Sequence, residues 1–423
     1  MNRAARRIVK TYVSLTLLST FANSFIWGIN TLFLLDAGLT ITEAFTANAF
    51  FTAGQVLFEI PTGIVADTRG RRTSFLLGTA TLFAATIAYL WLWQIRGPFW
   101  AWAIVSALLG LGFTFFSGAT EAWLVDGLKA AGYKKDLDSV FAKGAIASGI
   151  AMLTGTVAGG LVAQYTNLGV PYIMRIVALG LTFLLALFLM HDEGFSAKKR
   201  TSFFEEVRDV ATESIEFGLR SAPIRWMTLS GFFNGGVAIF AFYAMQPYLL
   251  ELYGESDSYA IAGIAAAIVA GAQIVGGFLV PFTGRLFAKR TSLLIAGAAV
   301  SSLALLLIAL VGNFWLVLIL LAAWAIVWSA SGPVRQSYVN GIVPSQQRAT
   351  VLSADNMFAS AGGVVSQPAL GKVADVWGYP ASYLGSAVFQ ALALPFLILA
   401  RQEKAKSDPI DSALLDRASP RPS

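Results

Sequence analysis

The sequence contains no cysteine and only one histidine, His191, among its 423 residues. Without cysteine the chain can form neither a disulfide framework nor a thiolate metal site, and a single histidine cannot make a histidine cluster. The sequence also offers no set of a nucleophile, a histidine and an acid that could act together. We therefore expect no cofactor, no metal site and no catalytic site, and a protein that is not an enzyme.

Charged residues are scarce as well, at 13% of the chain, whereas soluble domains carry about 25%. Because 56% of the residues are hydrophobic, so few charges could not cover a soluble core, which excludes a soluble enzyme, a fibrous protein and a disordered scaffold. A lipid bilayer would solvate this apolar surface. The formal net charge of +6 does not indicate a nucleic-acid partner, because such proteins concentrate charge on a water-exposed face.

Apolar runs that are long enough to cross a bilayer recur throughout the chain. A spanning helix needs ~20 residues, and twelve spans would leave about 35 residues for each. We expect spans near 10–35, 42–66, 73–95, 98–125, 139–163, 171–190, 225–250, 258–284, 290–311, 314–342, 350–375 and 380–400. These runs are too continuous for the short alternating strands of a membrane barrel. The sequence predicts an all-α membrane protein with twelve transmembrane helices.

Lysine and arginine are distributed unevenly between the expected loops. If the N-terminus is cytoplasmic, most of the 30 basic residues fall in the inner loops and tails, and the outer loops keep only Arg96. Cytoplasmic loops of membrane proteins carry this excess of positive charge. We expect a multi-pass protein of the cell (inner or plasma) membrane, with both termini in the cytoplasm and the lipid bilayer around it.

The longest polar interval, 191–224, divides the expected spans six and six. Apolar residues recur at helical spacing between Phe203 and Leu219, which predicts an amphipathic helix on the inner membrane surface or, equally, a solvated linker helix. We divide the chain into a six-helix bundle at 1–190, this cytoplasmic linker, a second six-helix bundle at 225–400 and a disordered tail at 401–423.

Short matches between the two halves recur at a nearly constant offset. The matching pairs are Arg71-Arg72-Thr73-Ser74 with Lys289-Arg290-Thr291-Ser292, Ser117-Gly118 with Ser331-Gly332, and Asn23 with Asn234. They follow the order that a duplicated six-helix unit requires. A parallel repeat of this kind is a transporter architecture, with the substrate site near the middle of the membrane between the halves.

The ten residues from Gly63 to Arg72, between the second and third expected spans, resemble the signature loop of the major facilitator superfamily. The matching residues are Gly63, Asp67, Gly70, Arg71 and Arg72. The preceding Phe58-Glu59-Ile60-Pro61-Thr62-Gly63 resembles a variant found among bacterial drug exporters. The resemblance implies the major facilitator fold of two pseudo-symmetric six-helix bundles, and a likeness to bacterial 12-span drug:proton antiporters.

A second stretch, in the fifth expected span, resembles the antiporter motif of the same superfamily. It contains Gly155, Gly159 and Gly160, although Thr156 replaces the usual proline. The arginine that drug antiporters often carry early in the fourth span is absent, because Ser106 stands in the best register before Gly110. Proton coupling therefore cannot be carried over from that arginine.

The resemblance also implies roles within the signature loop. In the superfamily the acid of this loop faces the eleventh span, so Asp67 is expected to accept hydrogen bonds from the N-terminal amides of that helix. Gly63 and Gly70 would allow close packing and a tight turn, and Arg71 and Arg72 would hold the loop inside. We interpret the loop as a gating latch, with simple retention of positive charge inside as the alternative.

Only a few ionisable residues remain within the spans, where each costs ~2.5–3.5 kcal/mol on insertion scales and is a functional candidate. Glu59 lies in the second span, Glu121 and Asp126 in the fourth, and Arg335 at the repeat position of Glu121. We hypothesise that Glu121 and Arg335 pair when the inner side closes, and that protonation of Glu121 biases the switch. The alternative for this pair is a static ion pair or two unrelated structural charges. Glu59 is the competing proton site or a cation-binding acid, with a hydrogen-bonded helix–helix contact as its own alternative.

Other polar residues have expected roles in packing or in the cavity. Asn23, Trp27 and Asn30 share one face of the first span and, with Asn234, are expected to form a substrate-cavity wall; interhelical hydrogen bonding is the alternative. The charged residues nearer the span ends are expected to be structural or interfacial: Lys143, Asp355, Lys372 and Asp375.

The leading interpretation is a monomeric secondary transporter that exports lipophilic small molecules or drugs in exchange for protons, by alternating access. Its partners would be protons and a small-molecule substrate. The chain has no phosphate-binding loop, which argues against a nucleotide-driven pump. The alternative is a proton-coupled importer (symporter) of an organic anion or nutrient, with Arg335 as the substrate anchor.

Overall fold

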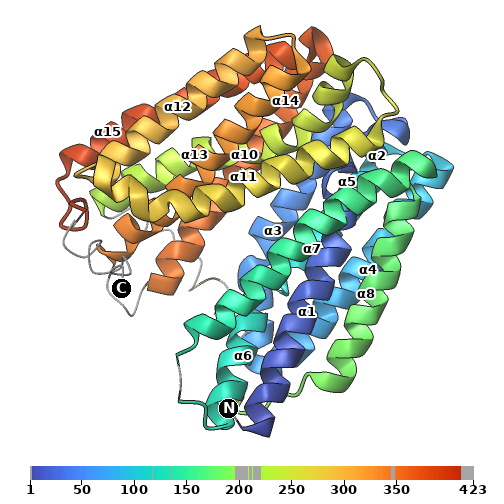
Figure 1. The fold of residues 1–423 in the computed structure, drawn as a ribbon, viewed down its shortest axis with the longest axis vertical. Coiled ribbons are helices and arrows are strands. Elements are labelled where there is room, and N and C mark those ends of the chain that lie inside the picture. Colours follow the sequence, from blue (N-terminus) through green and yellow to red (C-terminus); the bar gives the residue numbers. More distant parts are fainter. Residues whose placement is uncertain are drawn as a thin grey trace, which may run out of the picture. The chain divides into compact units, whose positions relative to one another are not determined.

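The computed structural model describes residues 2–116, 118–134, 136–195, 208, 212, 221–343 and 348–410, and their side chains except at 283–285 and 348–350. Nearly all of these residues are helical (Figure 1), as the long apolar runs predict. The amphipathic helix expected at 203–219 lies almost entirely outside the described residues, as does the end of the tail at 411–423. Both stay predictions.

The helices follow the expected spans closely. In the first half of the chain they are α1 (Arg3–Trp27), α2 (Asn30–Asp36), α3 (Ile41–Arg69), α4 (Arg71–Ile95), α5 (Phe99–Thr114), α6 (Ala119–Ala130), α7 (Asp138–Tyr165) and α8 (Val170–Leu189). In the second half they are α10 (Ala222–Tyr253), α11 (Tyr259–Leu286), α12 (Arg290–Leu310), α13 (Phe314–Asn340), α14 (Arg348–Ala391) and α15 (Ala393–Gln402). Local signals fix several ends: Thr40 and Glu43, for example, form a reciprocal capping box at the start of α3.

Ten helices of the described residues are long and apolar enough to cross a membrane, or eleven if the bent pair α1–α2 is one span. The stretch Val351–Gln402 counts once among them although it has 52 residues. Gly378 interrupts it with a φ of 83°, and a straight helix of that length would far exceed a ~30 Å hydrocarbon core.

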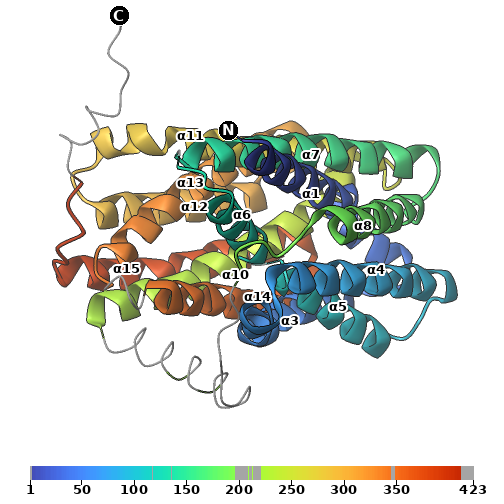
Figure 2. The ribbon, with the colours of Figure 1, turned by 90° about the horizontal axis from the view of Figure 1, so that it is seen from below.

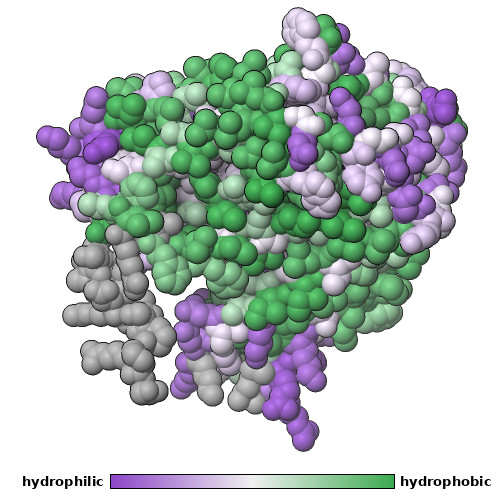
Figure 3. Space-filling model, turned by 45° about the horizontal axis from the view of Figure 1, so that its top comes forward, coloured by the Kyte–Doolittle hydropathy of each residue, from purple (hydrophilic) through white to green (hydrophobic). Residues whose placement is uncertain are grey.

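Apolar side chains cover much of the surface in Figure 3. Phe278 and Leu286, for example, are 74% and 79% exposed, as lipid-facing residues would be.

Two expected spans are broken helices. The first bends by 48° between α1 and α2, next to Gly28. The fourth consists of α5 and α6, and Gly118 precedes α6 in the left-handed conformation with a φ of 66°. The repeat position of Gly118 is Gly332, which lies inside the continuous helix α13. The two halves therefore differ in backbone at equivalent positions.

The chain forms two compact units. One comprises Met1–Asp209 and Tyr253–Ala267, and the other comprises Val210–Leu252 and Ile268–Ser423. In the first unit α1 packs along α7 and α3 along α5, and in the second α12 packs against α13 and α14 (Figures 1 and 2). The first part of α11 groups with the first unit, which a division of the sequence at 191–224 does not anticipate.

Glycines allow the closest helix contacts within each unit. A Cβ at Gly159 of α7 would lie 2.7 Å from the carbonyl carbon of Phe25 in α1. A Cβ at Gly362 of α14 would lie 2.7 Å from the carbonyl carbon of Phe232 in α10. Small residues let the backbones of membrane helices approach this closely. The same kind of crossing thus joins the first and fifth spans of one half and the corresponding spans of the other.

The chain that follows the last helix of the first half turns back onto its own unit. In this segment, 190–195, the Asp192 carboxylate accepts a hydrogen bond of 2.9 Å from the backbone nitrogen of Arg72, at the start of α4. The carbonyl of His191 accepts one of 2.7 Å from the Trp123 indole of α6. His191 therefore lies just beyond the end of α8. We call 190–195 the first return segment.

A second return segment, 403–410, does the same in the second unit. Asp408 is 2% exposed and accepts hydrogen bonds of 2.9 Å from both the backbone nitrogen and the Oγ1 of Thr291, at the start of α12. Ser407 donates a hydrogen bond of 2.7 Å to the carbonyl of Tyr338 in α13. Residues 401–410 are thus ordered, whereas we expected disorder from 401 onwards, because the tail supplies the cap that α12 lacks in its own sequence.

Replacing Asp408 by alanine should destabilise the protein by about 0.5–2 kcal/mol, the usual cost of losing a helix cap. The reason is that the backbone nitrogen and the hydroxyl of Thr291 both lose their acceptor in a buried place. Thermal unfolding of the purified protein in detergent would measure the loss. Asp257→Ala, at an exposed carboxylate, is the matched control, and equal unfolding temperatures for the two variants would contradict the capping role.

Candidate functional site: the signature loop and an ion pair in a pocket of the second unit

The signature loop is the turn between α3 and α4. Gly70 makes the turn with a φ of 102°, a conformation that glycine adopts without strain. The Asp67 carboxylate pairs with the Arg71 guanidinium at 2.6 Å, and Arg72 donates a hydrogen bond of 2.8 Å to the Leu187 carbonyl. The loop is therefore held to α8 and to the first return segment.

Gly63 lies in the last part of α3, one residue after Thr62. A Cβ there would meet no atom of the described residues within 4 Å, and its expected role in close packing stays a prediction. The expected bond between Asp67 and the amides of the eleventh span stays a prediction. In this structure the Asp67 carboxylate is paired with Arg71 of its own loop, one turn further along the chain.

The glycines of the antiporter-like motif lie on one side of α7. Besides Gly159, a Cβ at Gly155 would lie 2.8 Å from the Ser24 Cβ, and a Cβ at Gly160 would lie 2.8 Å from the Gly263 Cα. Thr156, which replaces the proline of the motif, is buried and donates its hydroxyl to the Met152 carbonyl at 2.7 Å. The motif thus forms a seam of close backbone contact.

The intramembrane acids of the first unit occupy different environments. Glu59 is half-buried in α3, next to Pro61, and the Thr62 hydroxyl donates to the carbonyls of Phe58 and Glu59 around the proline. Glu121 is exposed in the first turn of α6, and Asp126 is half-buried one turn further on. Within the described residues Glu121 has neither a hydrogen bond nor an ion pair.

Arg335 of α13 is paired inside the second unit with Asp355 of α14. The Arg335 Nε donates to the Asp355 Oδ2 at 3.0 Å, and Nη2 donates to Oδ1. The same nitrogen donates to the Met227 carbonyl of α10 at 2.9 Å, and Thr228 donates to the Asp355 Oδ1 at 3.1 Å. The two side chains are 17% and 11% exposed. The expected alternation of Arg335 with Glu121 stays a prediction.

A glycine makes room for this pair. A Cβ at Gly231 of α10 would lie 2.7 Å from the Arg335 Cζ, so any larger residue would displace the guanidinium. Arg335 lies about 7.5 Å from the end of α13, at 1.5 Å of rise per residue. The helices therefore hold the ion pair at a defined place, against α10.

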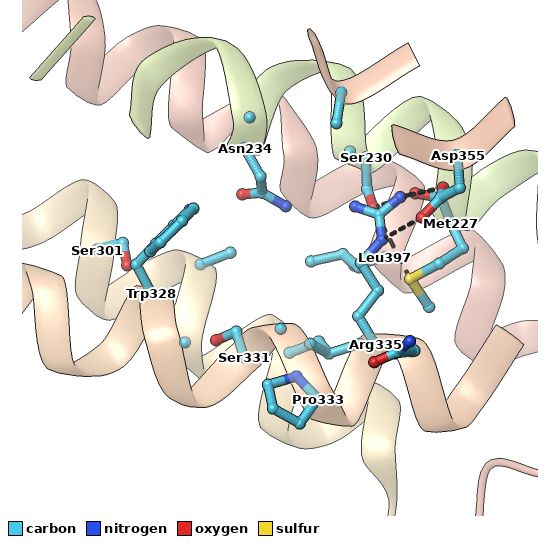
Figure 4. A pocket seen from close by; sticks show the side chains of 18 of the residues that line it. Met227, Ser230, Asn234, Ser301, Trp328, Ser331, Pro333, Arg335, Asp355 and Leu397 are labelled. Carbon is cyan, nitrogen blue, oxygen red and sulfur yellow. Dashed lines mark hydrogen bonds and ion pairs between the residues drawn. The ribbon is translucent and has the colours of Figure 1, made fainter. Parts of the chain in front are cut away.

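The ion pair lines a pocket of about 610 Å³ that is formed entirely within the second unit. Figure 4 shows Arg335 reaching from α13 toward Asp355, with Asn234 above and Trp328 and Ser301 on the opposite side. Gln336 and Asn356, at exposed positions, also line it. This volume is in the range of small-molecule sites, 300–1,000 Å³ in rough terms.

The expected cavity residues separate into two groups. Asn30 is buried in the first unit, where its amide donates to Asn48 and accepts from Tyr172, both at 3.0 Å. Asn23 is buried in α1, and Trp27 is the last residue of that helix. Asn234 lines the pocket of the second unit and accepts a hydrogen bond from Gln390. The structure thus brings Asn234 together with Arg335, and gives Asn30 the interhelical hydrogen bonds that were the alternative.

Sequence reasoning missed Asp355, Gln390 and Trp328 as members of this pocket. Asp355 was expected to be structural or interfacial because of its place near the end of a span. It is instead the partner of Arg335, the residue selected for its charge. Arg335 was identified because a charged residue within an apolar run is costly to insert into a membrane. The same cost applies to Asp355, so the same argument could have identified it.

Known proteins resemble this chain in family and in fold. The Major Facilitator Superfamily profile matches residues 12–288 and 273–421. The nucleoside transporter NupG has 14% sequence identity and a TM-score of 0.71, with 94% of this chain and 99% of NupG covered. A bacterial homologue of the human lysosomal transporter Spinster has 15% identity and a TM-score of 0.73, with coverage of 96% and 99%.

The D-xylose–proton symporter is a third similar structure, with 16% identity, a TM-score of 0.68 and coverage of 93% of this chain and 97% of the symporter. At such identities these structures show the fold alone. No curated protein sequence matches this chain. The match of the family profile over almost the whole length and the all-helical fold agree: the chain belongs to the Major Facilitator Superfamily and is a multi-pass membrane transporter.

Proposed function

We propose that the protein exports lipophilic small molecules in exchange for protons, by alternating access of two six-helix bundles with twelve spans in total. It acts as a monomer in the plasma membrane, with both termini in the cytoplasm. The observation that carries the proposal is the neutralised charge of Arg335 in a partly apolar pocket, which also contains Trp328 and Leu397. Because the Arg335 guanidinium is ion-paired with Asp355, it attracts an anionic ligand only weakly, and the pocket suits lipophilic compounds.

Proton exchange requires an acid that can reach water. Glu121 is exposed within a span and makes no hydrogen bond or ion pair among the described residues, which suits a carboxylate that binds and releases protons. Glu59 lies in the second span beside Pro61, where the helix lacks one backbone donor. Ionisable residues at such places in a membrane are functional candidates. We propose Glu121 as the first proton-coupling residue and Glu59 as the second, with Asp126, Arg335 and the signature loop in gating.

The close seam of α7 with α1 and the start of α11 contains the antiporter-like motif. Gly159 and Gly160 bring the backbones together without room for side chains, as small residues do at crossings of membrane helices. The likeness of this stretch to the antiporter motif supports the antiporter part of the proposal.

Glu121→Gln and Glu59→Gln each remove a carboxyl group that we propose carries the proton. In an efflux-deficient host, each variant is expected to lower the inhibitory concentration of the drugs at least about tenfold relative to the wild type. A panel of unrelated lipophilic compounds would be compared for the wild type and both variants. Glu251→Gln, at an exposed carboxylate of α10, is the control and should leave resistance unchanged. Full resistance in both site variants would refute their role in coupling.

The alternative is a proton-coupled importer of an organic anion, and one observation favours it. The Nη1 nitrogen of Arg335, which lines the pocket, makes no hydrogen bond within the described residues. Everted membrane vesicles distinguish the two functions. Accumulation of a drug that needs an acidic interior supports export, whereas release of a preloaded organic anion that needs the same acidic interior, without competition by drugs, supports the importer.

A further inference from the structure

We propose that the pocket of the second unit binds uncharged ring compounds that carry hydrogen-bond acceptors, and that the Arg335–Asp355 pair sets this preference for charge. The inference names a substrate class for the proposed exporter and rests on that function for its physiological meaning. It makes the ion pair a specificity determinant, whereas the proton-coupling residues lie in the other unit. Binding to the site can be measured without transport.

The shape and lining of the pocket favour a ring. Trp328 forms one wall and is 39% exposed, and Leu294 and Leu397 are apolar lining residues on α12 and α15. A volume of about 610 Å³ accommodates a compound of two or three rings with space to spare. Aromatic faces bind flat apolar groups in offset or edge contacts.

The polar groups of the pocket fix the position of hydrogen-bonding atoms. Gln390 donates through Nε2 to the Asn234 Oδ1, so this amide pair retains the Asn234 Nδ2 donor and the Gln390 Oε1 acceptor. The Arg335 Nη1 carries two further N–H donors, because the other nitrogens are used by Asp355 and Met227. The site therefore offers more donors than acceptors, which selects a ligand with acceptor atoms such as a carbonyl oxygen.

The charges of the pocket cancel. Arg335 and Asp355 are the two charged residues among those that line it, and the lining residues from α10, α12 and α15 are uncharged. An anionic ligand at the Arg335 Nη1 is repelled by the nearby Asp355 carboxylate, and a cationic ligand is repelled by the guanidinium itself. Because a charged ligand also loses its hydration in the pocket, a neutral ligand is favoured over both.

The structure holds the pair firmly enough for it to select ligands. Thr228 and the Met227 carbonyl supply additional bonds, and Gly231 provides the space beside the guanidinium. A paired charge that is fixed by neighbours costs less to bury and does not rearrange for each ligand. The charge of the site is therefore set by these two residues, and changing either one should change the charge of the preferred ligand.

Three probes that share one ring system test the inference: naphthamide (neutral), naphthoate (anionic) and naphthylmethylammonium (cationic). Calorimetry on the purified full chain in detergent would give the dissociation constants. We expect the wild type to bind naphthamide about tenfold more tightly than either charged probe, which corresponds to one decade in Kd. Asp355→Asn should shift the preference to naphthoate, and Arg335→Gln should shift it to naphthylmethylammonium. A charged probe that binds tightest to the wild type, or preferences unchanged in both variants, would overturn the inference.

Filling the pocket tests whether the probe binds there. Gly332 lines the pocket, and a Cβ at this position would meet no described atom within 4 Å. Gly332→Leu should therefore fold normally and weaken naphthamide binding at least about tenfold. Gly277→Leu, on α11, also enters open space but away from the pocket lining, and it should bind like the wild type. Equal affinity in the two leucine variants would place the ligand elsewhere and refute the site.

The inference and the proposed function can fail separately. If naphthamide binds as expected but everted vesicles do not accumulate it with an acidic interior, the export function fails and the site stands. If drug resistance depends on Glu121 but Gly332→Leu leaves both naphthamide binding and resistance intact, the site fails and the exporter stands.

Discussion

Gly159→Val and Gly362→Val are each expected to destabilise the protein severely, with folded yield lost or the unfolding temperature strongly lowered. A Cβ at either position would lie 2.7 Å from a backbone carbonyl carbon, of Phe25 in one unit and of Phe232 in the other. Backbone atoms cannot move aside as the end of a side chain can. Overpacking costs about 1–3 kcal/mol in ordinary cores, and these helices would have to separate.

The measurement is the thermal unfolding of each variant in the same detergent, together with the amount of monodisperse protein. Gly180→Val in α8 is the matched control, because the nearest atom to a Cβ there is 3.6 Å away, at the Phe83 ring. The control should remain close to the wild type. Stable Gly159→Val and Gly362→Val variants would show that neither crossing is close in solution.

Breaking the Arg335–Asp355 pair should have the second large effect, and removing both partners should reverse most of it. Asp355→Leu leaves a buried guanidinium without its carboxylate, which typically costs about 3–5 kcal/mol, whereas replacing a whole buried pair by apolar residues is often close to neutral. We therefore expect Arg335→Met/Asp355→Leu to be more stable than Asp355→Leu alone.

A double-mutant cycle on the free energy of unfolding in mixed micelles measures this coupling. We expect a coupling energy of at least about 1 kcal/mol, because two hydrogen bonds join the two side chains and two more hold them to Met227 and Thr228. Additive losses in the double variant would mean that the two residues do not interact. Transport should be lost in the double variant even where stability returns, since the pocket then lacks its donors.

The fold was largely predictable from the apolar runs and from the signature loop. Long apolar runs give helices because lipid leaves no other partner for the backbone, and the turn at Gly70 followed from the motif. The breaks at Gly28 and Gly118 were not predictable, because Gly332 at the repeat position of Gly118 remains helical. Tertiary contacts decide whether a glycine interrupts a helix.

The sequence allowed single members of the site to be predicted, but not which of them lie together. Arg335 was identified because a charge in an apolar run is costly, yet its partner lies on another helix, and sequence does not give the rotation of one helix relative to the next. The same reason explains why Asn30 turned out to bond Asn48 and Tyr172. Asn234 lies in the pocket, where Gln390 bonds it.

The two return segments give each half of the chain its own closure. After the last helix of each half, an aspartate caps the third span of that half: Asp192 at Arg72 and Asp408 at Thr291. The first turn of each of these helices thus takes its cap from a peptide about 120 residues further along the chain in the same unit. A truncation that removes the second return segment should therefore loosen the start of α12 and leave the start of α4 unchanged.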